Sequence, residues 1–268
     1  MLEERPSTGS GLEDGENKMD EGKEKSLAFR CLALTGSFET GQLAPGCFAA
    51  VAGNFDGQGM SFGALQWNFG QGTLQPLLQE MFDYDHDIAL QIFGEDLNPL
   101  HKAIKDGTEA SVSFAIGTIL APGSKSVSRT WKEKFRLLGL THEFQVIETK
   151  AVAAYYAKAV KLCEEYELWT ERGRALMFDI AVQNGGISEK IKNIILEDVG
   201  KLAPDFPPEA FETAKMRIIA KRRAEAANPK YIEDVRTRKL CIAEGQGIVH
   251  GINYDLAGQF GLSLQKMQ

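Results

Sequence analysis

Two carboxyl side chains, Glu39 and Asp56, stand 17 positions apart, at the two ends of a stretch that becomes rich in glycine. Cleavage of a glycosidic bond needs two such groups facing each other across the bond. One of them must be protonated, and Phe38 beside Glu39 supplies an apolar neighbour of the kind that raises a carboxyl pKa. Asp56 lies on a glycine-flanked turn with Ser61 five residues further on, which suits the holding of a water molecule. The pair therefore indicates an acid and a base, although a surface Glu and a turn-forming Asp would give the same spacing.

A helix and a region of short strands must position these carboxyls. Leu27, Cys31 and Leu34 share one helical face, so we expect a helix that begins near residue 26 and places Glu39 at its C-terminal end. Residues 41–72 contain too much glycine for a continuous helix. Short strands are expected at 48–51 and 60–65, with the second carboxyl on the turn between them.

The rest of the chain has helical periodicity. Helices are expected from residue 73 onward and at 85–94, 97–106, 108–120, 126–138, 141–168, 170–184, 186–200, 208–227 and 230–244. The pattern predicts a mainly α (α+β) fold, a helical body with a small glycine-rich β region. We expect residues 1–25 to be a disordered tail or linker and residues 26–268 to be one catalytic domain, with two lobes if a boundary falls near 120–126.

Composition excludes several classes of protein. The net charge is −7, and residues 1–25 carry eight acidic and four basic side chains, so the remainder is nearly balanced. A broad basic face for nucleic acid is therefore not expected. No apolar run is long enough to cross a bilayer, and the N-terminus lacks the apolar core of a secretory signal. The four cysteines form no CxxC pair. Cys31 and Cys47 bracket the candidate segment and could be bridged in an oxidising compartment; the alternative is four free and mostly buried thiols.

The run from Asp56 to Gly63, DGQGMSFG, resembles the active-site segment of the family 46 chitosanases, within the lysozyme-like superfamily. In that family a Glu closes the first long helix, and an Asp-Gly-Arg-Gly-aromatic-Thr-x-Gly stretch follows. The resemblance implies a lysozyme-like fold with Glu39 as general acid and Asp56 as general base. It places Ser61 where the family has a water-holding Thr.

Two weaker matches lie further along the chain. Residues 175–185, ALMFDIAVQNG, resemble the family's helical Asp-x-x-Val-x-His-Gly element. Residues 234–239, DVRTRK, followed by His250-Gly251, form a third match. Together the landmarks span residues 27–262. Asp179 and Asn184 are expected to support the cleft rather than to react.

Departures from the family pattern shift the expected substrate. Gln58 replaces an Arg, and Thr73 stands about where chitosanases carry an Asp suited to a free glucosamine amine. The run 65–70, LQWNFG, offers amides and aromatic faces that suit acetamido groups and sugar rings, and it looks like peptidoglycan-directed relatives among phage lysins and bacterial toxins. These features imply a muramidase. Substrate contacts are expected from Gln58, Gln66, Trp67, Asn68, Thr73 and Asn184.

Three alternatives remain open. A chitosanase would use the same carboxyls. A lytic transglycosylase needs only Glu39, and a non-catalytic wall-binding module would keep the aromatic side chains of Trp67 and Phe69 without turnover. A muramidase without a signal would reach the cell wall, in the periplasm or outside the cell, by another delivery route, and an immunity protein would be a possible partner.

No cofactor or metal is expected. Asn54-x-Asp56-x-Gln58 imitates the start of a calcium loop, but Leu65 stands where the loop requires a bidentate Glu. The acidic run at 83–87 is better explained by a helix N-terminus, whose dipole favours acids. The basic run at 221–223 is expected on a solvated helix face, where it could still contact anionic peptide stems or teichoic acids.

Overall fold

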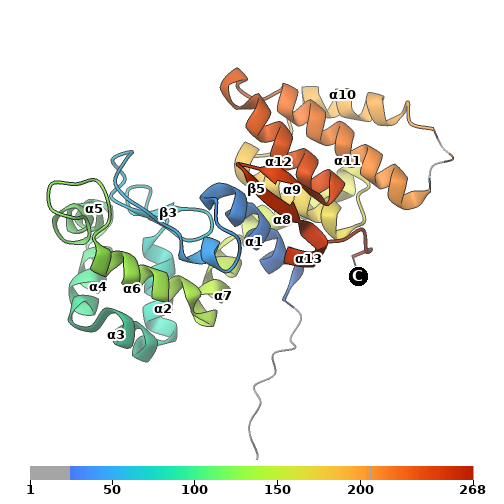
Figure 1. The fold of residues 1–268 in the computed structure, drawn as a ribbon. Helices are drawn as coiled ribbons and strands as arrows, with labels where there is room; N and C mark the ends of the chain where they lie inside the picture. The colour runs from blue at the N-terminus through green and yellow to red at the C-terminus, as the bar shows by residue number, and fades with distance from the viewer. Residues whose placement is uncertain (1–24, 204, 206, 268) are drawn as a thin grey trace, which may run out of the picture.

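The computed structural model describes residues 25–203, 205 and 207–267. The predicted tail therefore lies, except for Lys25, outside the described residues. Within them the expectation of a mainly helical protein with a small β region is confirmed (Figure 1). None of the described helices is both long and apolar enough to cross a bilayer.

The first part of the chain holds the sheet and the shorter helices. Its elements are α1 (Leu27–Thr40), η1 (Gly46–Ala49), β1 (Val51–Ala52), β2 (Ser61–Phe62), β3 (Trp67–Asn68), α2 (Gln75–Tyr84), α3 (His86–Phe93), η2 (Gly94–Asp96), α4 (Leu97–Lys105), α5 (Thr108–Phe114), η3 (Ala115–Ile119), α6 (Arg129–Leu140) and α7 (His142–Ala151). The second part has longer helices and a hairpin. Its elements are α8 (Ala153–Tyr166), α9 (Glu171–Asn184), α10 (Glu189–Val199), α11 (Pro208–Glu225), η4 (Pro229–Tyr231), α12 (Ile232–Glu244), β4 (Gln246–Val249), β5 (Ile252–Asp255) and α13 (Leu256–Phe260).

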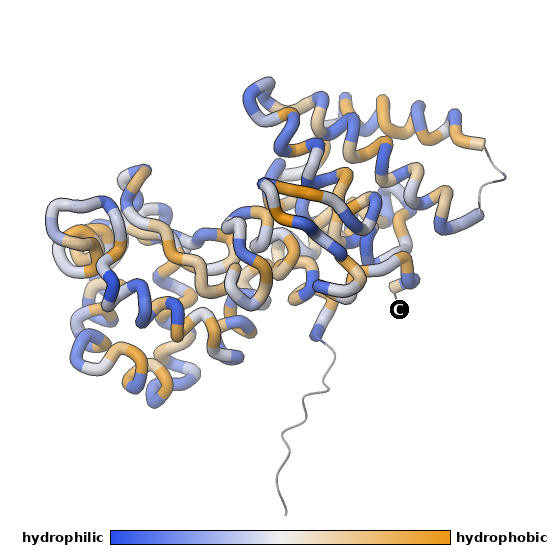
Figure 2. Tube along the Cα trace, viewed as in Figure 1, coloured by the Kyte–Doolittle hydropathy of each residue, from blue (hydrophilic) through white to orange (hydrophobic). Residues whose placement is uncertain are grey.

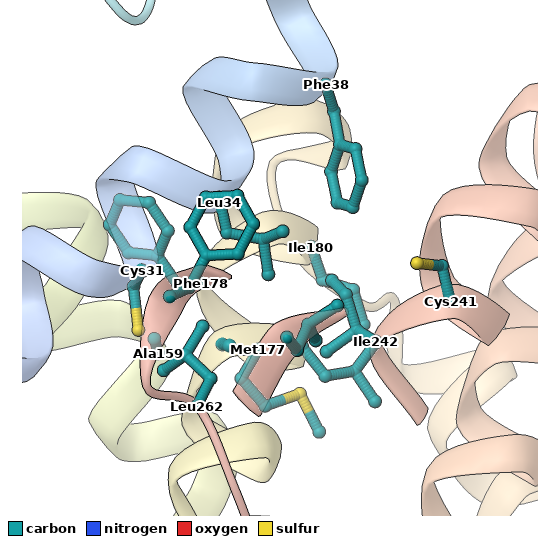
Figure 3. Close-up of a cluster of buried hydrophobic side chains, with 14 of the residues drawn as sticks. Cys31, Leu34, Phe38, Ala159, Met177, Phe178, Ile180, Cys241, Ile242 and Leu262 are labelled. Atoms are coloured by element: carbon teal, nitrogen blue, oxygen red, sulfur yellow. The ribbon is translucent and has the colours of Figure 1, made fainter. Parts of the chain in front are cut away.

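Two hydrophobic cores divide the protein into two lobes. In the large lobe α1 packs with α8 to α13 and the β4–β5 hairpin; Figure 3 shows Phe38 of α1, Phe178 of α9 and Ile242 of α12 in this core. In the small lobe the sheet packs with α2 to α7. Hydrophobic and hydrophilic residues alternate along the helices of both lobes (Figure 2). The predicted boundary at 120–126 is wrong: Ile119 and Trp131, on its two sides, share one core.

Helix α1 lies between the two lobes (Figure 1). Ser26 caps its start by accepting the N–H of Phe29, and Gly41 ends it in a left-handed conformation. Every residue from Cys31 to Phe38 is buried, so the helix is enclosed on all sides rather than on one face. Glu39 is the first exposed residue after this buried segment, which brings its carboxyl to the surface at a fixed position.

The small sheet contains less strand than expected. Strand β2 pairs antiparallel with β1 and β3, each pairing spanning two residues. The expected strand at 48–51 is largely a 3₁₀ turn, η1. The β4–β5 hairpin was not expected, since residues 230–244 were taken as the last element. Its turn is His250-Gly251, both with positive φ, as two-residue hairpin loops require.

Two other differences are local. The helix expected at 141–168 is interrupted at Val152, whose side chain enters the large core, so that α7 and α8 belong to different lobes. The helix expected at 108–120 widens after Phe114 into a π turn, η3. All four cysteines are buried and free, so Cys31 and Cys47 are not bridged. Burial raises the pKa of the Cys163 thiol to about 11 and keeps it protonated.

The lobes meet where α1 touches the turn between β2 and β3. A Cβ added to Gly36 would lie 2.7 Å from the Cβ of Ala64, so the contact depends on the missing side chain. The N–H of Ala64 in turn donates to the carboxyl Oε1 of Glu148 on α7, at 2.8 Å. The contacts of Ala64 with Gly36 and with Glu148 thus fix α1 against the sheet, one helical turn before Glu39.

Replacing Gly36 by Ala tests this contact. Ala improves helix propensity by up to about 1 kcal/mol, but an overpacked core typically costs about 1–3 kcal/mol. We expect a net loss of stability, because a backbone-supported Ala64 cannot move away as a flexible side chain would. Urea unfolding measures it, with the exposed helical Gly117→Ala as control, which has open space around the added Cβ. A Gly36→Ala protein as stabilised as the control would contradict the prediction.

Glu148 makes the junction sensitive to pH. It is fully buried, and burial raises its pKa well above the ordinary range, against the opposing effects of the Ala64 N–H and the Trp67 indole. The folded protein therefore holds a proton that the unfolded chain releases above the ordinary carboxyl pKa. Because the folded state binds more protons in that range, its stability falls as pH rises.

We expect Glu148→Gln to remove this pH dependence. Between pH 5 and 8 the wild type should lose stability relative to the variant, at up to about 1.4 kcal/mol per pH unit, until the folded pKa is passed. Urea unfolding at several pH values gives the two curves, with Glu109→Gln, an exposed site, as control. Parallel curves for wild type and Glu148→Gln would show that the buried carboxyl does not hold its proton.

Candidate active site

Glu39 lies on a pocket of about 480 Å³ between α1, α9, the end of α11, α12 and the β4–β5 turn. We call it the Glu39 pocket. Its lining residues are Phe38, Glu39, Gln183, Asn184, Arg223, Ala226, Ala227, Asn228, Tyr231, Asp234, Val235, Arg238 and His250. The side chain of Glu39 is 33% exposed, so its carboxyl is accessible to a ligand in the pocket.

A buried arginine holds Glu39 in place. Arg238 Nη1 donates to Glu39 Oε1 at 2.8 Å, while Nη2 donates to Asp179 Oδ1 at 2.6 Å. The Arg238 side chain is 3% exposed and that of Asp179 is fully buried. Glu39 Oε2 has no hydrogen bond within the described part of the chain. One carboxyl oxygen is therefore fixed, and the other is left for a proton or a ligand.

Behind this pair lies a compact charge cluster. Lys239, fully buried, donates to Asp179 Oδ2 and to Gln183 Oε1, both at 2.5 Å. Thr35 of α1 donates to Asp179 Oδ1 at 3.3 Å. Asp179 therefore receives two cations and a hydroxyl, and its negative charge offsets the positive charge that would otherwise act on Glu39.

The network continues along the pocket wall to the hairpin. Gln183 Nε2 donates to Asp234 Oδ2 at 2.8 Å, and the other oxygen of Asp234 lies 2.5 Å from His250 Nε2. A continuous chain of polar contacts thus runs from Glu39 to His250. It joins three helices and a turn that are far apart in the sequence.

Helix periodicity explains why these side chains meet. Each helix contributes two residues four positions apart: Thr35 and Glu39 on α1, Asp179 and Gln183 on α9, and Asp234 and Arg238 on α12. Residues at this spacing share one face of a helix. Three such faces converge where α1 and α12 both pack against α9.

Electrostatics favour the charged states of Asp179 and Arg238, whereas burial lowers the pKa of Lys239 to about 8 despite the opposing effect of Asp179. Burial alone would raise the pKa of Asp179, but the positive charges of Arg238 and Lys239 outweigh it and lower that pKa to about 2. Burial would likewise lower the pKa of Arg238, but Asp179 and Glu39 raise it well above its ordinary value. The guanidinium therefore stays charged throughout the working pH range, and its contact with Glu39 persists.

Phe38 lines the Glu39 pocket, but its side chain is almost fully buried in the large-lobe core (Figure 3). There its ring packs against Tyr254 at 4.8 Å between centroids. The Arg238 guanidinium lies over the ring at 5.2 Å. The immediate neighbour of the Glu39 carboxyl is therefore the Arg238 guanidinium, and the Phe38 ring packs against that guanidinium.

Asp56 lies on the exposed loop between β1 and β2. Its carboxyl accepts the N–H of Gln58 at 3.1 Å, and Asn54 in the same way accepts the N–H of Gly59 at 3.0 Å. The two side chains that imitated a calcium loop are thus engaged in local turns. Asp56 and Ser61 do not line the Glu39 pocket. Their roles as base and water holder remain predictions.

Most of the expected substrate contacts on the sheet have local partners. Gln66 donates to Gly63 O at 3.0 Å, and the N–H of Asn68 donates to the hydroxyl of Thr73 at 2.9 Å. The indole nitrogen of Trp67 is buried, and its ring packs against both cores. The backbone carbonyl of Gln58 accepts the N–H of Gly70 at 3.0 Å. Their contact with a substrate remains a prediction, whereas Asn184 does line the Glu39 pocket.

Several pocket residues were not singled out from the sequence. Arg238, Asp234 and His250 lie in the weak third match, and Asn228 and Tyr231 lie just before it. The i, i+4 spacing of 179 with 183 and of 234 with 238 was the available signal. This spacing indicates a shared site only once α9 and α12 are known to pack together.

The other charged runs have structural roles. Asp85 caps α3 by accepting the N–H of Ile88 at 2.9 Å. No group of three or more potential metal ligands gathers in the described residues. The basic run at 221–223 is not one solvated face, because Arg222 pairs with Asp198 and Arg223 lines the Glu39 pocket.

No protein-family model and no curated protein matches the chain. Among solved structures, a native chitosanase from Bacillus subtilis MY002 is similar at 18% identity with a TM-score of 0.46, over 83% of this chain and 89% of that chain. A family 46 chitosanase from Gynuella sunshinyii, in complex with chitotetraose, is similar at 10% identity with a TM-score of 0.49, over 86% and 97%. Because identities and TM-scores are this low, the chemistry of this chain must be inferred from its own residues.

The charge cluster gives a stability prediction. Asp179→Asn leaves Arg238 and Lys239 buried with their main counter-charge removed, and we expect a loss of about 3–5 kcal/mol. The same change at Asp198, which pairs with Arg222 at the surface, should cost far less, because solvent screens that pair. Since the pKa of Asp179 is lowered by folding, the wild type should lose this stabilisation as pH falls towards 2. Urea unfolding of both variants checks it; equal losses would contradict the prediction.

Proposed function

We propose that this chain is a lysozyme-like glycoside hydrolase that cuts the amino-sugar backbone of peptidoglycan. The observation that carries the proposal is Glu39: its carboxyl opens into the Glu39 pocket, with one oxygen fixed by Arg238 and the other without a hydrogen bond in the described residues. A carboxyl oriented in this way can deliver a proton to a bound oxygen atom.

The proposed reaction is a single displacement with two carboxyls. Glu39 protonates the glycosidic oxygen as the bond to the sugar breaks. Asp56 removes a proton from a water held with Ser61, and that water attacks the opposite face of the sugar. Such an inverting mechanism places the two carboxyls about 6.5–9.5 Å apart in the productive complex. The lobe junction at Gly36 and Ala64 is what links the helix of the acid to the strands that flank the base.

The lining of the pocket supports a sugar ligand. Asn184 and Asn228 provide amide groups, and Tyr231, 49% exposed, provides an aromatic face. Amides can pair with hydroxyl and acetamido groups, and exposed aromatic rings commonly stack on sugar rings. On this proposal the protein acts at the bacterial cell wall, in the periplasm or outside the cell, after delivery by a route of its own.

Glu39→Gln tests the acid. It removes the proton donor while keeping side-chain volume, so we expect turnover of purified peptidoglycan to fall by about 10²–10⁴-fold with an unchanged fold. Mass spectrometry of the released products measures it, and circular dichroism confirms folding. Glu95→Gln, an exposed site, is the matched control. Full activity in a folded Glu39→Gln protein would refute the proposal.

Asp56→Asn separates the alternatives in the same assay. A hydrolase should lose reducing-end products with this variant, whereas a lytic transglycosylase would keep activity and release 1,6-anhydro sugars. Chitosan is digested in parallel, and cleavage of chitosan alone would replace peptidoglycan by chitosan as the substrate. The absence of product from both polymers would identify a binding module.

A further inference from the structure

A second pocket adjoins the Glu39 pocket. It measures about 420 Å³ and is lined by Asn184, Gly185, Gly186, Ile187, Ser188, Ile191, Arg223 and Ala226. Three residues, Asn184, Arg223 and Ala226, line both pockets. The two pockets therefore flank a common wall, and a polymer bound at Glu39 can extend past Arg223. We call the second one the Arg223 pocket.

The carboxylates of the Glu39 pocket already have partners. Glu39 pairs with Arg238 at 2.8 Å, and Asp234 accepts from Gln183 and contacts His250. Glu39 is therefore paired with a cation, whereas the partners of Asp234 are an amide and an imidazole.

Arg223 has no such partner. It forms no ion pair and no side-chain hydrogen bond with any described residue, and its Nε is buried without an acceptor. Arg222, the preceding residue, pairs instead with Asp198 at 2.6 Å and with Glu225 at 2.7 Å. Burial lowers the pKa of Arg223, and no carboxylate offsets that effect. A half-buried guanidinium without a counter-charge favours an incoming anion.

The surroundings of the Arg223 pocket also favour an anionic ligand. Lys158 donates to Gly185 O, and a Cβ on Gly186 would lie 3.1 Å from its Nζ, so a second cation lies at the edge of the pocket. Glu189, on the first turn of α10, forms its ion pair with Lys192 and not with Arg223; its Oε2 lies 4.0 Å from Lys192 Nζ. Asn184 Oδ1 is buried without a donor, which leaves an acceptor for an N–H group beside the cations.

We propose that Arg223 binds a carboxylate carried by the substrate, such as the lactyl group or peptide stem of an N-acetylmuramic acid unit next to the bond that Glu39 cleaves. This inference rests on the proposed function and adds its substrate class: an anionic amino-sugar polymer. A planar guanidinium pairs with a carboxylate through two parallel hydrogen bonds. The N–H of an amide next to that carboxylate matches the free acceptor of Asn184.

Two probes of equal length test the proposal on the full chain. One is a tetrasaccharide of alternating N-acetylglucosamine and N-acetylmuramic acid, and the other is the neutral tetrasaccharide of N-acetylglucosamine. Titration calorimetry with Glu39→Gln protein measures binding without turnover. Adding Arg223→Gln should weaken binding of the carboxylated probe by about tenfold to a hundredfold and leave the neutral probe unchanged. Arg223→Lys, which keeps the charge, should recover part of the loss, and the exposed Arg129→Gln should have no effect.

The outcomes separate this inference from the proposed function. Equal losses for both probes, or no loss for either, would overturn the carboxylate site while leaving the hydrolase intact. Binding of neither probe, together with no turnover by the wild type, would overturn both. Preference for the carboxylated probe that disappears with Arg223→Gln and returns in part with Arg223→Lys is the expected result.

Discussion

The buried carboxylate of Asp179 is the interaction on which the arrangement of the large lobe depends. Without it, the side chains of Arg238 and Lys239 would place two positive charges in the core, at a cost that no nearby apolar contact could offset. With it, α9 and α12 are joined through the core, and α1 is joined to them through Thr35 and Glu39. The position of Glu39 at the pocket follows from that cluster, since Arg238 binds Asp179 through Nη2 and Glu39 through Nη1.

A second constraint operates at the lobe junction. The close approach of Gly36 to Ala64 and the buried carboxyl of Glu148 fix the sheet against α1. The two carboxyls of the proposed site are thus held by different means: Glu39 by a charged cluster in the large lobe, and the loop of Asp56 by packing and hydrogen bonds at its base. The loop that carries Asp56 is exposed, with Phe55 at 67%, whereas Glu39 follows a fully buried helical segment.

Charge pairing also connects the site with its proposed substrate. Glu39 is paired with Arg238, whereas Arg223 has no carboxylate partner among the described residues. A basic run of three residues is thereby divided by helix geometry: Arg222 faces Asp198 on α10, and Arg223, about 100° further around the helix, faces the pockets. The same residues that composition assigns to a solvated face can therefore carry specificity.

The sequence by itself determined the helical character, most helix positions, and the place of Glu39 in the last turn of α1, because helix periodicity and glycine-rich breaks are local signals. It also indicated free buried cysteines as an alternative to a disulfide. Only the tertiary structure decided that Phe38 points into the core, that Val152 divides α7 from α8, and that the hairpin turn brings His250 to Asp234. Tertiary structure likewise decided which charges are paired, since Glu39 and Arg238 are 199 positions apart. Pairing over such a separation depends on how helices pack, which no local pattern specifies.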